Sequence, residues 1–162
     1  MHFGLIVSPV PGHLLPGCAL SRALQRRGHR VTALQILDAS GELKRQGVGF
    51  AAVGIDVFPA GSWARRWRPV REGWGSRAHA ATIALHRDLT EVMCRDVPSL
   101  GPALGLDALL VDQLQPQGAA LAEHLGVPFA TFCTMLPLAG DPRGIYPPVI
   151  TAWSCADDRV GR

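Results

Sequence analysis

Two residues whose types could transfer a proton each follow an apolar run of the sequence. His13 comes soon after the run His2–Ser8, and Asp112 directly follows Leu109–Val111. In a doubly wound parallel sheet the first and fourth strands are commonly neighbours, and ligands bind at the carboxyl ends of the strands, so we expect the two side chains to meet. Asp112 would accept a hydrogen bond from one imidazole nitrogen while the other takes a proton from a bound hydroxyl. Taken singly, His13 also fits a turn residue and Asp112 an N-cap.

The loop Pro9–His13 also indicates a phosphate site. It leads into a helix that we expect Pro16 to open and Gly28 to close. Backbone N–H groups near Gly17 would then be unpaired donors at the positive end of that helix, where phosphate oxygens bind. The sequence contains neither GxGxxG nor GxxxxGK[ST] after the first strand. Asp38, after the second strand, leaves open a weaker alternative, a dinucleotide-dependent oxidoreductase in which it binds ribose.

The hydrophobic pattern predicts the α/β fold that could position these residues. Apolar runs without alternation are typical of parallel strands covered on both faces. Five runs are predicted as strands: His2–Ser8, Arg30–Ile36, Val48–Val53, Asp107–Val111 and Val127–Phe132. Helical periodicity precedes Gly28 and recurs in Ser40–Gln46, Ala78–Arg95 and Pro116–Leu125. This alternation favours a Rossmann-like, doubly wound parallel sheet.

Length and composition restrict the class of protein. A chain of 162 residues fits one domain, and 48% hydrophobic residues can supply its core. A net charge of +3 is too small for a nucleic-acid footprint. Four scattered cysteines without a CxxC pair argue against disulfides, and we expect no metal site. The N-terminus does not resemble a signal peptide and no apolar run approaches the length of a membrane span, so the cytoplasm is the expected location.

Several stretches resemble the UDP-glycosyltransferase family, in particular its zeaxanthin glucosyltransferase and macrolide glycosyltransferase branch. The opening of that family is similar to His2–Val7, Gly12–Pro16 and Leu24–Thr32. Later matches to the same branch are Leu109–Gln113, Ala122–Phe129, Leu136–Leu138, Tyr146–Pro148 and Trp153. The resemblance covers most of residues 2–153 and is strongest near the N-terminus.

The resemblance implies a GT-B fold, in which an N-terminal acceptor domain faces a C-terminal donor domain. It implies inverting transfer of a hexose from a nucleotide-sugar, expected to be a UDP-sugar, to a hydroxyl of a hydrophobic small molecule that is carotenoid-like or macrolide-like. The family uses no essential metal, and no further cofactor is expected. Its base corresponds to His13 and the partner of that base to Asp112. Four further residues are expected to contact the substrate: Gly12, Gln113, Trp63 and Trp67.

Only part of that architecture has a counterpart in the sequence. Residues 1–153 resemble an incomplete N-terminal acceptor domain, residues 154–162 match nothing in the family, and no stretch resembles the donor domain. We therefore expect a truncated or split glycosyltransferase, inactive alone, whose donor site a partner chain could supply. The alternative is a non-catalytic Rossmann-like binding module that acts through a partner chain.

The segment Gly54–Arg77 is a long connection that carries three tryptophans and five arginines. In the resembled fold it lies near the entrance for the acceptor. Aromatic and basic residues together are typical of proteins that rest on an anionic membrane, so we expect a peripheral membrane contact here. The alternative is a mobile, solvated loop whose tryptophans pack locally. Binding of nucleic acid is not expected, because stacking platforms are usually spread over a sheet face.

Overall fold

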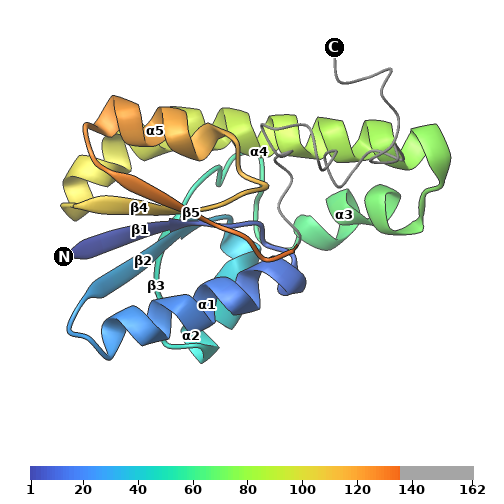
Figure 1. The fold of residues 1–162 in the computed structure, drawn as a ribbon. Helices are drawn as coiled ribbons and strands as arrows, with labels where there is room; N and C mark the ends of the chain where they lie inside the picture. Colours follow the sequence, from blue (N-terminus) through green and yellow to red (C-terminus); the bar gives the residue numbers. More distant parts are fainter. Residues whose placement is uncertain (136–162) are drawn as a thin grey trace, which may run out of the picture.

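A computed structural model describes residues 1–135 and shows within them a five-stranded parallel sheet between two layers of helices (Figure 1). The strand order is β3-β2-β1-β4-β5. The bounds are His2–Ile6 (β1), Arg30–Gln35 (β2), Gly49–Ala52 (β3), Ala108–Asp112 (β4) and Phe129–Phe132 (β5). The predicted fold class and all five predicted strands are confirmed, and β1 and β4 are neighbours, with Ile6 paired to Val111.

Helices cover both faces of the sheet (Figure 1). One face carries α1 (Pro11–Gln25), the short 3₁₀ helix η1 (Leu37–Ala39) and α2 (Ser40–Arg45). The other face carries α4 (Gly75–Leu104) and α5 (Gln117–Leu125), while α3 (Trp63–Glu72) lies beyond the carboxyl ends of the strands. Of the helices within residues 1–135, none combines the length and the apolar character that crossing a bilayer requires.

The central strand β1 is covered by helices on both faces, which explains why its sequence is apolar without alternation. Leu5 points towards α1 and α2 and belongs to one buried cluster, which includes Leu14 and Cys18 of α1. Ile6 points to the opposite face and belongs to a second cluster with Met93 of α4. Successive side chains of a strand alternate between faces, so a strand covered on both sides must be apolar at every position.

The helix α1 begins five residues earlier than the sequence predicts, at Pro11 instead of Pro16. Proline is tolerated at the first helical position because the N–H that it lacks would be unpaired there. His13 therefore lies in the first turn of α1, and its backbone N–H donates to the carbonyl of Val10 (2.9 Å). The prediction that backbone N–H groups near Gly17 are unpaired was wrong, because this residue lies buried within the helix. A Cβ at this position would lie 3.4 Å from Val7.

Two further expectations are corrected in the segment after β3. The predicted loop Gly54–Arg77 is largely helical, because it contains α3 and the start of α4. The helix α4 has 30 residues and continues past Arg95, through Pro98 and Pro102. Its first half packs on α3 and its second half on the sheet and α5, with Gly101 close to Leu125. This packing compensates for the backbone hydrogen bonds that the prolines cannot make.

The remaining helices end as their sequences predict, with glycines of positive φ after α2 and α5, namely Gly47 (φ 69°) and Gly126 (φ 66°). The family-like motifs at 136–138, 146–148 and 153 and the tail 154–162 lie outside the described residues.

Candidate active site

His13 and Asp112 contact each other at the carboxyl edge of the sheet. His13 stands in the first turn of α1, and Asp112 is the last residue of β4. The distance between His13 Nδ1 and Asp112 Oδ2 is 2.6 Å. The predicted proximity of the two side chains is confirmed, and it follows from the pairing of β1 with β4.

The carboxylate of Asp112 is held rigidly in place. Its side chain is fully buried, whereas that of His13 is 16% exposed. Oδ2 contacts the imidazole and Oδ1 accepts the backbone N–H of Leu114 (3.2 Å). A buried carboxylate attracts positive charge strongly, because little water screens it. It therefore orients the imidazole and stabilises the imidazolium that forms when the ring takes a proton.

Thr134 is a member of the site that the sequence analysis missed. Its Oγ1 lies 2.5 Å from the same Nδ1 of His13. With two oxygen atoms facing it, Nδ1 carries the proton of the neutral ring, which leaves the lone pair of Nε2 free to accept one. Thr134 follows β5, the neighbour of β4, so the rule that found Asp112 could also have found it.

Gln35 is a second residue that the sequence analysis missed. It holds the chain between β1 and α1 in place. It is fully buried at the end of β2. Its Nε2 donates to the carbonyl of Val7 (2.5 Å), and its Oε1 accepts the backbone N–H of Ile36 (2.7 Å). These bonds fix the chain just before the loop that leads to His13. The only signal in the sequence was a polar residue within an apolar run.

Two of the predicted substrate contacts adjoin the pair. Gly12 precedes His13 and faces open space, with no atom within 4 Å of the position of a Cβ. Gln113 follows Asp112 and is partly exposed, and its backbone N–H donates to the carbonyl of Phe132 (3.1 Å).

The other two predicted contacts, Trp63 and Trp67, pack away from the pair. Their rings stack on each other in α3, 5.5 Å apart, and lie against a cluster that includes Ile36 and Phe58. The alternative of local packing therefore holds for Trp63 and Trp67 but not for the exposed Trp74, and the segment that was expected to be a loop contains a helix.

A cavity of about 310 Å³ lies beside α1 but on the side away from His13. Its apolar lining includes Pro11, Leu14 and Leu15 of α1. The other lining residues are Pro9, Ala39, Trp63 and the charged Asp38, Glu42 and Arg45. The three residues of α1 are spaced i, i+3 and i+4, so they share one face of the helix. His13, two positions after Pro11, projects from the opposite face.

Asp38 has a structural task. Its Oδ1 accepts the backbone N–H of Gly61 (2.5 Å), and its Oδ2 accepts that of Trp63 (2.7 Å). The carboxylate therefore pairs with an N–H group in the first turn of α3 that no other residue of that helix would bind, and it connects this helix to η1, which follows β2. Both oxygens are engaged, which leaves the ribose-binding alternative without support from geometry.

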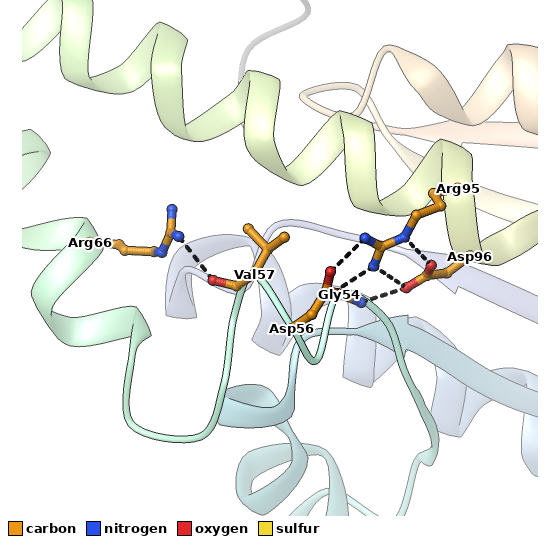
Figure 2. A network of polar contacts seen from close by, with 6 residues as sticks. All are labelled: Gly54, Asp56, Val57, Arg66, Arg95 and Asp96. Carbon is orange, nitrogen blue, oxygen red and sulfur yellow. Dashed lines mark hydrogen bonds and ion pairs between the residues drawn. The ribbon is translucent and has the colours of Figure 1, made fainter.

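A network of ion pairs fastens the chain after β3 to α4 (Figure 2). Arg95 of α4 binds both carboxylate oxygens of Asp56, at 2.6 and 2.7 Å. Asp96 contacts Arg95 and accepts the backbone N–H of Gly54 (2.7 Å). The hydrogen bonds from Arg95 lower the pKa of Asp56 from its ordinary 3.8 to about 2.

Comparison with known proteins relates the geometry to a family. No family model matches the chain. The zeaxanthin glucosyltransferase of Pantoea ananas is 33% identical over 141 residues, which are 87% of this chain and 32% of that protein. The zeaxanthin glucosyltransferase of Pseudescherichia vulneris is 32% identical over 162 residues, 99% of this chain and 37% of that protein. The chain thus spans about a third of the length of these relatives.

Solved structures agree on the fold. The glycosyltransferase SsfS6 of Streptomyces sp. SF2575, complexed with thymidine diphosphate, has a TM-score of 0.63 at 20% identity, over 87% of this chain and 40% of that chain. The spinosyn rhamnosyltransferase SpnG has a TM-score of 0.59 at 21% identity, over 88% of this chain and 36% of that chain. The chain has the fold of the N-terminal domain of GT-B glycosyltransferases.

The resemblance stated from the motifs is confirmed, including its restriction to the N-terminal part of these proteins. In this GT-B domain, His13 and Asp112 occupy the edge of the sheet where α/β proteins bind ligands. Among residues 1–135, no group of three or more histidine, cysteine, aspartate or glutamate side chains is arranged to hold a metal ion.

Proposed function

We propose that the chain is the acceptor-binding part of a glycosyltransferase in which His13 is the general base and Asp112 its partner. The observation that carries this proposal is the contact of 2.6 Å between the two side chains at the carboxyl edge of the sheet. The relatives from Pantoea ananas and Pseudescherichia vulneris, both named zeaxanthin glucosyltransferases, support it. The acceptor that fits these names is a hydrophobic alcohol of the carotenoid class.

The proposed reaction is a single inverting displacement. His13 Nε2 accepts the proton of the acceptor hydroxyl as the oxygen forms a bond to the anomeric carbon of the sugar. The bond from that carbon to the diphosphate breaks on the opposite side, and the nucleoside diphosphate leaves with the electron pair. Asp112 holds the ring through Nδ1 and stabilises its positive charge, while Thr134 contacts the same nitrogen.

The donor is proposed to be a nucleotide-sugar bound by a second domain, on the same chain or on a partner chain. The relatives are about three times as long as the matched region, which supports such a domain. We expect a UDP-sugar. Two glycosyltransferases of similar fold, SsfS6 and VinC, have been solved in complex with thymidine diphosphate. A thymidine diphosphate sugar is therefore the alternative donor.

The test replaces His13 by alanine in the chain joined to the remaining C-terminal part of the Pantoea ananas relative. With zeaxanthin and UDP-glucose, or thymidine diphosphate-glucose, we expect turnover to fall roughly 10²–10⁴-fold while acceptor binding stays nearly unchanged. His124→Ala is the matched control, because this exposed histidine lies at the far end of α5. Equal turnover of the His13→Ala and unaltered proteins would remove this residue from the mechanism and favour a binding module.

A further inference from the structure

The helix α3 has two faces of different chemistry. Trp63, Trp67 and Val70 follow helical spacing and pack inward on the cluster around Phe58. Arg66 turns to the same side, where it binds Asp88 (3.0 Å) and lies over the ring of Phe58, 4.6 Å from its centre. The inner face is therefore occupied by the protein itself.

The outer face is cationic and largely unpaired. Arg65 and Arg68 of α3 and Arg77 in the first turns of α4 are exposed, and within residues 1–135 they have no ion-pair partner. Arg71 is also exposed but pairs with Glu72 (2.6 Å). Five arginines and one glutamate lie between Trp63 and Arg77, so this segment is more positive than the whole chain, whose net charge is +3.

Trp74 adds an apolar group between the two helices. It is 90% exposed, more than any other large apolar side chain in the described part of the chain. It stands at the N-cap of α4, between Arg71 and Arg77. Exposing an indole to water is unfavourable, whereas its apolar ring and single N–H suit the boundary between lipid and water.

We propose that the outer surface of the segment Trp63–Arg77 docks on an anionic lipid membrane. Arg65, Arg68 and Arg77 would contact the headgroup phosphates, and Trp74 would enter the interface. The segment lies beyond the carboxyl ends of the strands (Figure 1). The inference does not depend on the proposed activity.

The structure favours lipid over nucleic acid as the partner. Single-stranded nucleic acid needs several aromatic rings on which successive bases can stack. In this segment two of the three rings, Trp63 and Trp67, stack on each other and pack on the core. One exposed indole among arginines fits a membrane interface.

The test measures co-sedimentation of the chain with vesicles. We expect binding to vesicles that contain phosphatidylglycerol and little binding to pure phosphatidylcholine, with the difference lost at high salt. Replacing Arg65, Arg68 and Arg77 by glutamate should weaken binding by about a hundredfold or more. The matched control replaces Arg26, Arg27 and Arg30 by glutamate, which changes the net charge equally at exposed positions near the other edge of the sheet.

A second variant, Trp74→Ala, tests the indole separately. We expect weaker binding and loss of the blue shift in tryptophan emission that vesicles induce in the unaltered chain. Similar binding to both kinds of vesicle, or an equal loss in the control, would overturn the proposal. So would preferential binding of a single-stranded DNA oligonucleotide over the anionic vesicles.

Discussion

The edge of the sheet around His13 and the segment Trp63–Arg77 arrange charge in opposite ways. At the edge, one fully buried carboxylate is enclosed by partners from different elements. In the segment, Arg65 and Arg68 are exposed and have no ion-pair partner within residues 1–135, on a helix whose other face is packed. The edge fixes the position of one proton acceptor. The segment instead spreads positive charge over a broad surface, and attraction of an anionic partner to such a surface requires no precise geometry. Substitutions should therefore affect chemistry at the edge and affect stability or adsorption in the segment.

The largest expected effect is on turnover, and it comes from a substitution at the edge of the sheet. Asp112→Asn, in the chain joined to a donor domain, should lower turnover by about 10⁴-fold, because an amide N–H facing Nδ1 favours the wrong tautomer of His13. Steady-state kinetics with the acceptor would measure it. Asp107→Asn is the control, since this carboxylate accepts the backbone N–H of His2 (2.7 Å) at the opposite edge of the sheet. A similar loss in both variants would contradict a special role for Asp112.

A smaller effect separates the two faces of the segment. Trp67→Ala removes the stack on Trp63 and the contact with the core, so the free energy of unfolding should fall by about 1–3 kcal/mol. Trp74→Ala changes an exposed ring and should stay within about 0.5 kcal/mol. Urea denaturation measures both. If the two variants lost stability equally, the assignment of an inner and an outer face would be wrong.

The smallest effect concerns the ion pairs that hold the chain after β3. Arg95→Leu should speed hydrogen exchange at the amides of Val57 and Phe58, whose bonds to Gly54 the network supports. Because the pKa of Asp56 is lowered on folding, its stabilising contribution is present above pH 3.8 and is lost as the pH falls towards 2. At equal pH, the protection factors of these amides in the unaltered chain should therefore approach those in the variant as the pH falls towards 2.

Glu91→Leu on the same helix provides the control for this exchange experiment, because the exposed Glu91 pairs, among the ion pairs of residues 1–135, with the exposed Arg87 and not with the chain after β3. Exchange at Val57 and Phe58 should not change in that variant. Acceleration there equal to that in Arg95→Leu would mean that any charge change on α4 loosens the loop.

The contact between His13 and Asp112 could be predicted because it follows from topology alone. Strand order places the ends of β1 and β4 together, and apolar runs locate those ends. The start of α1 could not be predicted in the same way, since Pro11 and Pro16 are equally suited to a first turn. The same rule applies to Thr134 after β5, but a threonine is neither an acid nor a base, so its residue type did not single it out.

The helix α3 escaped prediction for a different reason. Its sequence contains Pro69 and is flanked by glycines, which locally favour a turn. It becomes helical because its tryptophans pack on Phe58 and because Asp38, distant in sequence, binds its first N–H groups. Interactions between remote elements override local preference here, and a single sequence does not display them.

The helix α4 connects the segment Trp63–Arg77 with the sheet. With 30 residues it is about 45 Å long, and only its second half rests on the sheet. Because Met93 and Val97 hold that second half against the sheet, the first half projects beyond the sheet with α3 packed along it. The arginines and Trp74 are thereby presented at a distance from the histidine and its carboxylate, so a surface that the protein meets there need not disturb the pair.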